Sequence, residues 1–392
     1  MILTIKQEEG LKTIVERHRN HEKYTTIAGY AGTGKSTLVR HAIAALDVDE
    51  DKVAYATFTG KAAEVLRKKG NPGAQTLHRL LYDHVPKQGG GFFRRPKERL
   101  EYDIVVVDEV SMVPNSMIKQ LLKHQVYIIF LGDPFQLPQI DKDETHDLLD
   151  HPHVFLDEVM RQAAESEIIR ITMAIRNRET IPYSNGEEVM VLPEKQLVDG
   201  CYIWADQVIT ATNLKRKFIN EYMRDMKGFK GLPQDGERMI CLRNYWDDIS
   251  DTGEPLVNGT TGIIKNPKEG YRMIPPYIKA DNHKIETIIC DFVTDDGSIF
   301  HNVEMDKKLI TTGDKCVDWR TQYQLNKMKN RIGDIVPREF DYGYAITGHK
   351  AQGSQWEKVL VLEENFPFDR TEHARWLYTV CTRPEKKLVL VR

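Results

Sequence analysis

The sequence predicts an α/β protein built on parallel sheets, with a smaller β-rich module inserted late in the chain. Two observations predict it. Short apolar or β-branched runs alternate with helical patterns in the first part, as expected of parallel strands joined by crossover helices. After about residue 240, closely spaced strands and turn dipeptides replace that alternation, and strand–helix character then returns. The simplest division is two α/β domains, with the β-rich module inserted into the second.

The first α/β part is predicted from apolar runs that end at turn or polar residues. Helical patterns lie between these runs, at residues 36–46 and 61–69. The expected strands are Thr25–Ala28, Val53–Thr57, Ile104–Val107 and Val126–Leu131.

The β-rich module is predicted from shorter runs and strong turn dipeptides. Asp296-Gly297 lies between two strand-like runs, as the turn of a hairpin does, and Asn258-Gly259 marks another turn. Strand–helix character resumes with Val359–Leu362 and Leu388–Val391. The strands expected in the module are Met239–Leu242, Gly262–Ile264, Glu286–Phe292 and Ser298–Val303.

Overall charge does not point to a polyanionic partner. The 392 residues include 55 Lys and Arg against 58 Asp and Glu, a net charge of −3. Residues 61–100 differ, because they hold ten basic and three acidic residues, a local balance of +7. Such a run is either a solvated helix face with a loop or a nucleic-acid contact. Any nucleic-acid site must therefore arise from local clustering.

Cysteine use and hydropathy indicate a cytoplasmic protein. The five cysteines are scattered and form no C-x-x-C pair, which argues against a disulfide framework or a zinc site and fits a reducing cytosol. The longest apolar runs are far shorter than the roughly 20 residues of a membrane span, so we expect no membrane partner.

A phosphate-binding motif is complete at residues 29–36, Gly-Tyr-Ala-Gly-Thr-Gly-Lys-Ser. It follows an expected strand and precedes an expected helix, as the Walker A motif requires. Glycines let backbone N–H groups surround a phosphate, and the helix N-terminus adds partial positive charge. Lys35 is expected to reach the β- and γ-phosphates, and the Ser36 hydroxyl to bind Mg²⁺.

The second half of an NTPase site follows the strand Ile104–Val107. Asp108 is expected to hold the metal and Glu109 to polarise the attacking water. Gln136 follows the strand Val126–Leu131, where its amide can sense the γ-phosphate. These motifs predict nucleotide hydrolysis without stating what the hydrolysis drives.

Two later segments complete an ordered set, residues 343–354 (Gly-Tyr-Ala-Ile-Thr-Gly-His-Lys-Ala-Gln-Gly-Ser) and 376–384 (Trp-Leu-Tyr-Thr-Val-Cys-Thr-Arg-Pro). With these motifs the sequence resembles the superfamily 1 DNA helicases of the RecD/Dda-like group, close to the compact phage Dda type. The resemblance implies two RecA-like P-loop domains, at residues 1–155 and at 156–238 with 338–392. It also implies a pin insertion at about residues 83–101 and an SH3-like β module at 239–337.

The resemblance assigns roles around ATP. Gln7 resembles the glutamine that reads adenine, although such a residue also starts helices. Arg161 and Arg383 resemble two arginine fingers that neutralise charge on the γ-phosphate. The cofactors implied are ATP and Mg²⁺. The nucleotide-contacting loop is expected to comprise Gly29, Gly32, Thr33, Gly34, Lys35, Ser36 and Thr37.

The resemblance also assigns contacts with a DNA strand. Hydroxyl and lysine side chains suit phosphates and carry no sequence information, and local capping is the alternative for the threonines. Phe92 and Phe93 are expected in the pin, as a wedge or a stacking platform. The other implied contacts are Thr57, Thr59, Lys61, Thr76, His78, Thr347, His349 and Lys350.

The function implied is an ATP-dependent helicase that moves 5′→3′ on single-stranded DNA and unwinds duplex. The implied partners are single-stranded DNA and single-strand/duplex junctions, and replication or recombination proteins are further candidates. The implied location is the cytoplasm of a bacterial or phage-infected cell. We expect a motor that is active as a monomer. An RNA-directed helicase and an ATPase that remodels protein–DNA complexes stay open as alternatives. A nucleotide kinase would leave Arg161, Gln136 and residues 347–354 unexplained.

Overall fold

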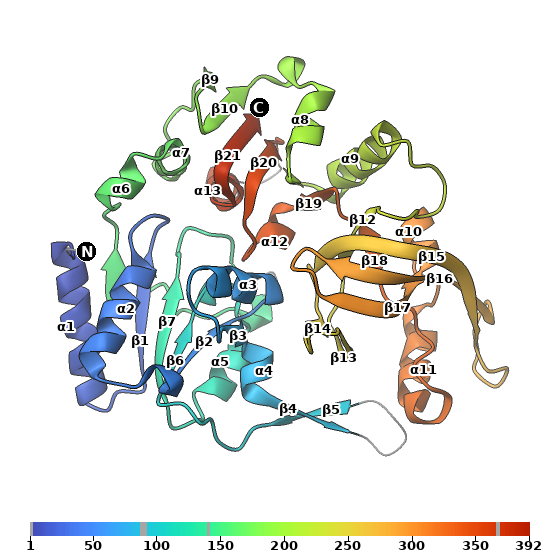
Figure 1. Ribbon diagram of the computed structural model, residues 1–392, viewed down its shortest axis with the longest axis horizontal. Helices are drawn as coiled ribbons and strands as arrows, with labels where there is room; N and C mark the ends of the chain where they lie inside the picture. Colours follow the sequence, from blue (N-terminus) through green and yellow to red (C-terminus); the bar gives the residue numbers. More distant parts are fainter. Residues whose placement is uncertain (1–2, 87–91, 139–141, 366–368) are drawn as a thin grey trace. The chain divides into compact units, whose positions relative to one another are not determined.

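The computed structural model describes residues 3–86, 92–138, 142–365 and 369–392. The chain forms two compact units (Figure 1). Unit 1 comprises residues 1–82, 96–213 and 346–392, and unit 2 comprises residues 83–95 and 214–345. The predicted division into two RecA-like domains with an inserted module cuts the chain differently and stays a prediction.

The first sheet of unit 1 is entirely parallel, with strand order β3-β2-β6-β7-β1-β8. Its strands are β1 (Tyr24–Gly29), β2 (Val53–Thr57), β3 (Gln75–Thr76), β6 (Ile104–Val107), β7 (Tyr127–Gly132) and β8 (Val154–Leu156). The helices of this part are α1 (Ile5–Arg19), α2 (Lys35–Leu46), α3 (Gly60–Lys68), α4 (Leu77–Leu81) and α5 (Asn115–Leu121). Short 3₁₀ turns lie at Glu50–Lys52, Val110–Met112 and Lys142–Glu144.

Burial on both faces explains why these strands are continuous apolar runs. Along β6, Val105 and Val107 belong to a core cluster with Leu77 and Phe130 on one face of the sheet. Ile104 and Val106 alternate with them and join a second cluster on the other face. A parallel sheet covered on both sides requires this pattern. The predicted α/β class with parallel sheets is therefore confirmed.

The second sheet of unit 1 has strand order β19-β11-β20-β21-β10-β9. Its pairs β11–β20, β20–β21 and β10–β21 are parallel, and β9 pairs antiparallel with β10 at one edge. The strands are β9 (Ser184–Asn185), β10 (Val189–Leu192), β11 (Gln207–Thr210), β19 (Ala345–Thr347), β20 (Trp356–Leu362) and β21 (Pro384–Val391). The helices are α6 (Arg161–Ala164), α7 (Glu167–Arg176), α8 (Asp199–Trp204), α12 (Gly348–Ala351) and α13 (Arg370–Cys381), with a 3₁₀ turn at Glu194–Gln196.

Unit 2 is built on an antiparallel sheet, in the order β17-β16-β15-β12-β18. Gly297, with a φ of 89°, closes the predicted hairpin between β16 and β17. A separate hairpin, β4 (Tyr82–Pro86) with β5 (Phe92–Pro96), lies where the pin was predicted. The other strands are β12 (Arg238–Cys241), β13 (Tyr245–Ile249), β14 (Pro255–Leu256), β15 (Thr261–Met273), β16 (Lys284–Thr294), β17 (Ile299–Asp306) and β18 (Phe340–Tyr342). The helices are α9 (Asn213–Met226), α10 (Lys307–Thr312) and α11 (Trp319–Ile332).

One feature of the strands differs from the expectation. β15 and β16 pair as a ribbon that runs as far as Met273 and Lys284, well beyond the run Gly262–Ile264 that the sequence suggested. The added residues of β15 are mostly polar and exposed on both faces, so they lack the apolar alternation of a half-buried strand.

None of the helices in the described ranges combines the length and the apolarity that crossing a membrane requires.

Candidate active site

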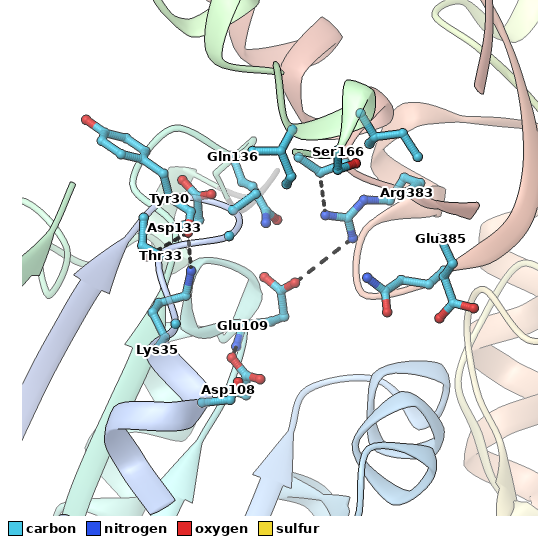
Figure 2. Close-up of a pocket in the computed structure, with 18 of the residues that line it drawn as sticks. Tyr30, Thr33, Lys35, Asp108, Glu109, Asp133, Gln136, Ser166, Arg383 and Glu385 are labelled. Atoms are coloured by element: carbon cyan, nitrogen blue, oxygen red, sulfur yellow. Dashed lines mark hydrogen bonds and ion pairs between the residues drawn. The ribbon is translucent and has the colours of Figure 1, made fainter. Parts of the chain in front are cut away.

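A pocket of about 590 Å³ lies in unit 1, at the carboxyl edge of the first sheet (Figure 2). Ligands of open α/β sheets bind at this edge. Side chains from the loops after β1, β6 and β7 line it on one side. Residues that follow β8, or that belong to the second sheet and its loops, line the other side, among them Ser166, Gln355, Thr382, Arg383 and Glu385. The pocket is therefore assembled from both sheets of unit 1.

The predicted phosphate loop joins β1 to α2 and lines this pocket. Gly32 and Gly34 have φ values of 75° and 77°, which glycine tolerates better than other residues. A Cβ at Gly34 would collide with Gln7 Nε2, so bulk is excluded there as well. The loop leaves α2 open at its N-terminus, with Ser36 and Thr37 in the first turn. Backbone N–H groups and the helix dipole there suit an anion.

Lys35 is held against its own loop. Its ammonium donates to Gly29 O at 2.7 Å and to Tyr30 O at 3.0 Å, and Thr33 Oγ1 donates to Tyr30 O at 2.9 Å. These bonds keep the positive charge over the floor of the pocket. A phosphate there would be met by a fixed cation and by the N-terminus of α2.

Gln7 lies beneath the phosphate loop and is only 1% exposed. Its amide forms a capping box with Thr4 at the start of α1, and its Nε2 donates to Thr33 O at 3.3 Å. The helix-start role weighed from the sequence is therefore present in the structure, together with a contact to the loop. Reading of adenine by Gln7 stays a prediction.

Asp108 and Glu109 follow β6. The ionised form of Asp108 is disfavoured by its surroundings, and the backbone conformation of Glu109 is strained. Burial and the neighbouring Glu109 charge raise the pKa of Asp108 to about 6, although the Glu109 N–H donates to its Oδ1 at 2.8 Å. Glu109 has a φ of 53°, a left-handed conformation that costs a non-glycine residue roughly 1–2 kcal/mol. Strained and pKa-shifted residues of this kind concentrate at functional sites.

Arg383 reaches the same carboxylate from the second sheet. Its Nη1 lies 4.0 Å from Glu109 Oε1. In the amide orientation that satisfies both neighbours, Gln136 donates to Glu109 Oε2 at 3.2 Å and accepts from Arg383 Nη2 at 3.3 Å. Glu109, Gln136 and Arg383 thus form one cluster (Figure 2).

The Arg383 guanidinium is positioned by the end of α13 and is only 3% exposed. Its Nε donates to Thr379 O at 2.9 Å and its Nη2 to Thr382 Oγ1 at 2.8 Å. Such bonds fix the direction of the side chain before any substrate arrives. Arg161 is the first residue of α6, but its side chain lies outside the described part of the structure, so its predicted finger role stays a prediction.

A tyrosine that the sequence reading did not select joins the two sides of the pocket. Tyr378 of α13 donates its hydroxyl proton to Asp133 Oδ2 at 2.6 Å and accepts from the Ala31 N–H of the phosphate loop at 2.9 Å. Asp133 is 2% exposed, and its burial raises its pKa. The hydroxyl therefore connects the phosphate loop to the loop that carries Gln136.

Two further side chains from the second sheet hold the backbone of the Gln136 loop. Thr379 Oγ1 accepts from Leu137 N at 2.9 Å, and Gln352 Nε2 donates to Leu137 O at 2.6 Å. Gln352 lies in the motif at residues 343–354 and Thr379 in the motif at residues 376–384. Their common partner, Leu137, is more than 200 residues away in the sequence. Motif membership was the available signal, and it did not reveal the contacts.

Three pocket residues carried no sequence signal. Tyr30 occupies a variable position of the phosphate motif, and its ring lies 3.9 Å below the Arg176 guanidinium. Lys69 Nζ donates to Gln355 Oε1 at 2.9 Å across the pocket. The motif pattern leaves such positions open, so only the folded arrangement identifies them.

The predicted DNA-contacting threonines differ in what their hydroxyls do. Thr59 and Thr76 cap α3 and α4 by accepting from Ala62 N and Arg79 N, so each hydroxyl proton stays available for a phosphate. Thr57 is fully buried and donates its proton to Thr59 O at 2.9 Å. Thr76 is only 3% exposed, so the geometry favours Thr59 over both Thr57 and Thr76 as a phosphate donor.

Of the remaining predicted contacts, Lys61, His78, Thr347, His349 and Lys350 lie in unit 1. Lys61 is 3.6 Å from Glu64 in α3, and His78 packs between Phe58 and Tyr82. Thr347 precedes α12, which contains His349 and Lys350, and burial lowers the pKa of His349. The side chains of Phe92 and Phe93 in β5 lie outside the described part of the structure.

The segment that follows α12 lies close to Thr59, one of the predicted DNA contacts. A Cβ at Gly353 would lie 3.0 Å from Thr59 Oγ1 and 3.2 Å from Ala62 Cβ. The segment after α12 therefore lies against the start of α3.

Comparison with known proteins matches two family models and several helicases to this chain. Residues 3–191 match the family model described as an AAA domain, and residues 342–391 match a UvrD-like helicase C-terminal domain. The chain is 25% identical to an ATP-dependent RecD2 DNA helicase of Deinococcus radiodurans, over 91% of this chain and 45% of that protein. It is 23% identical to the uncharacterized protein R530 of Acanthamoeba polyphaga mimivirus, over 99% of both.

The matched family models and relatives are those of superfamily 1 DNA helicases of the RecD/Pif1-like group, which this chain resembles over most of its length. This places it among ATP-hydrolysing enzymes. A solved Bacteroides Pif1 helicase, in complex with ADP-AlF3 and single-stranded DNA, has the same fold. It aligns with a TM-score of 0.52 and 16% identity, over all of this chain and 92% of that one. The chain spans less than half the length of the RecD2 relative.

Proposed function

We propose that the chain is an ATP-driven motor that moves 5′→3′ along single-stranded DNA and separates duplex ahead of it. The observation that carries the proposal is the cluster of Glu109, Gln136 and Arg383, which draws on both sheets around one phosphate loop. The resemblance to helicases suggests the substrate class, ATP and DNA. Direction, strand separation and the use of Mg²⁺ go beyond that resemblance.

The chemistry follows from the placement of charges around the pocket. Lys35 and the N-terminus of α2 hold the phosphates, and the Glu109 carboxylate accepts a proton from the attacking water. Arg383, and Arg161 in the same role, neutralise the negative charge that develops on the γ-phosphate. Because Gln136 contacts both Glu109 and Arg383, its amide responds to the state of the γ-phosphate.

The oxygen donors at the pocket fit Mg²⁺. Ser36 Oγ and the Asp108 carboxylate both line the pocket, and hard divalent cations prefer such oxygen ligands. A cation there would favour the ionised form of Asp108, whose pKa burial raises. When bound, Mg²⁺ would be held by Ser36 and Asp108 and would neutralise negative charge on the phosphates.

Coupling to DNA follows from the shared walls of the pocket. Nucleotide contacts made by both sheets favour one arrangement of the two sheets, and loss of the γ-phosphate removes part of that preference. The Tyr378 hydroxyl and the Gln352 amide transmit the change, since each bonds a loop of the first sheet. Thr59 and Lys61 on one side, and His349 and Lys350 on the other, would then alternate in holding the strand.

The proposal is tested by measuring ATP hydrolysis and movement along a DNA strand in the same preparation. ATP turnover should rise on addition of single-stranded DNA, and streptavidin should be displaced from a biotin at the 3′ end of an oligonucleotide but not at the 5′ end. Displacement from the 5′ end would reverse the direction. Turnover that responds only to RNA, or turnover without displacement at either end, would favour the RNA-directed or the remodelling alternative.

A further inference from the structure

The exposed aromatic residues of unit 2 include two on one face of α11. Trp319 is 72% exposed and Tyr323 is 57% exposed. They are four residues apart, and Lys327 follows after another four, so all three share one face of the helix. We call Trp319, Tyr323 and Lys327 the α11 stripe. Large aromatic side chains in water are costly, so an exposed pair in register indicates a binding surface.

The face of α11 that carries the stripe does not pack on the core of unit 2. Leu325 is buried with Ile274, Ile278 and Ile285, and Met328 and Ile332 pack against the same cluster. These aliphatic residues follow the spacing of the opposite face of the helix. On that side, Thr321 Oγ1 lies 3.2 Å from the carbonyl oxygen of Lys279. The stripe is therefore the outer face of a helix whose inner face packs on the core.

Positive charge predominates along α11. The sequence of α11 contains no acidic residue, and its basic residues include Arg320, Lys327 and Arg331. The acid that precedes it, Asp318, caps the helix by accepting from Arg320 N at 2.8 Å and Thr321 N at 3.1 Å. The whole chain has a net charge of −3, so this concentration of positive charge is local. A polyanion is the complementary partner.

Each exposed ring has a cation beside it. The Arg320 guanidinium lies 5.3 Å from the centre of the Trp319 ring, and the Lys327 ammonium lies 4.6 Å from that of Tyr323. An aromatic face with an adjacent cation matches a nucleotide, whose base stacks and whose phosphate is negative. Among the described side chains of α11, the outer face offers no aliphatic group that a partner helix would pack into a groove.

We propose that the α11 stripe binds unpaired nucleotides of a nucleic-acid strand, as a site separate from the residues predicted to hold the strand in unit 1. The inference rests on the proposed DNA-dependent function. Stacking on Trp319 and Tyr323 requires unpaired bases, while Arg320 and Lys327 contact phosphates. The stripe adds contact length on single strands and leaves the nucleotide pocket unaltered.

Binding of labelled single-stranded DNA by the full chain, followed by anisotropy, tests the stripe. Trp319→Ala with Tyr323→Ala should weaken binding at least about fivefold, since each stacked base contributes substantially. ATP turnover at saturating DNA should stay unchanged, while the DNA concentration for half-maximal turnover rises. Trp319→Phe should restore most of the affinity and remove part of the tryptophan quenching that DNA causes, a change that a merely structural role would not produce.

Tyr271→Ala is the matched control. Tyr271 is 63% exposed and has a lysine, Lys284, beside its ring, but it lies on β15. The proposal is overturned if the double variant binds DNA as the parent does, or if Tyr271→Ala weakens binding equally. It is also overturned if the double variant loses only self-association in sedimentation. Turnover that no single strand stimulates, even in the parent chain, contradicts the proposed function instead.

Discussion

The two sheets of unit 1 contribute to the pocket in opposite ways. Loops of the first sheet supply groups in costly states, namely Asp108 with its raised pKa, the left-handed Glu109 and the buried Asp133. The second sheet supplies Arg383 and Tyr378, each of which makes several hydrogen bonds. The acids of the first sheet therefore lower the stability of the fold, whereas Arg383 and Tyr378 stabilise the pocket through their hydrogen bonds.

This difference predicts opposite effects on stability. Neutralising a first-sheet acid should impair chemistry and leave the fold as stable or more so. Removing a second-sheet group should reduce both activity and stability. Such a trade between stability and activity is common where active sites carry strain. The four substitutions below follow in order of expected effect.

Arg383→Ala should have the largest effect on turnover. Removing an arginine that neutralises the transferred phosphoryl group costs about 10³–10⁵ in rate in related NTPases. The chain should also lose stability, because Glu109 and Gln136 lose their shared partner. DNA-stimulated ATP turnover and a thermal melt measure the two effects. Arg392→Ala is a matched control, because Arg392 pairs with Glu363 and does not line the pocket.

Glu109→Gln should follow, with turnover reduced about 10²–10⁴-fold because the amide cannot accept the proton of the attacking water. Nucleotide affinity, measured with a fluorescent ATP analogue, should stay within about threefold, since Lys35 and the phosphate loop are untouched. Stability should not fall. A variant that still hydrolyses ATP at the parent rate would remove Glu109 from the role of base.

Tyr378→Phe should uncouple the two sides with a smaller effect. The change leaves Ala31 N–H and Asp133 Oδ2 without this partner, which costs about 1–3 kcal/mol for a buried polar group. Stimulation of turnover by DNA should fall more than basal turnover does. Tyr127→Phe is the control, because its buried hydroxyl bonds Thr25 and Ile14 away from the pocket. Equal loss of stimulation in both variants would deny Tyr378 a coupling role.

Asp108→Asn should have the smallest effect, and it should stabilise the fold, whereas Arg383→Ala and Tyr378→Phe destabilise it. The folded pKa of about 6 exceeds the ordinary 3.8, so the folded state binds the proton more tightly and stability falls as pH rises through that interval. Above about pH 7, the substitution should therefore raise Tm by about 1–3 °C, while it weakens Mg²⁺-dependent turnover. The Tm gain should vanish below about pH 4. A Tm loss at neutral pH would contradict the comparison.

The predictable part of the site consisted of residues that end strands. Gly29, Asp108 and Gln136 follow apolar runs, and their chemistry is dictated by residue type and spacing. The contacts of Tyr378 and of Gln355 were not predictable, because they join residues that the sequence separates by hundreds of positions. Periodicity describes one element at a time and carries no information on such pairs.

The fold followed the same rule. Strands β2 and β6 agree with the expected ranges because burial on both faces makes them continuous apolar runs. The strand β11 was not expected, since it is short, begins at Gln207 and is stabilised by pairing with β20. The end of β15 was missed because its exposed residues follow no apolar pattern, although it pairs with β16, whose Ile285 packs in the cluster beside α11.

Strand displacement on two matched duplexes tests the central claim most directly. One duplex carries a 5′ single-stranded DNA tail and the other a 3′ tail, and both are incubated with ATP, Mg²⁺ and either the parent chain or Glu109→Gln. We predict unwinding by the parent chain from the 5′ tail alone and none by the variant. Unwinding from the 3′ tail, or equal unwinding by Glu109→Gln, would contradict it.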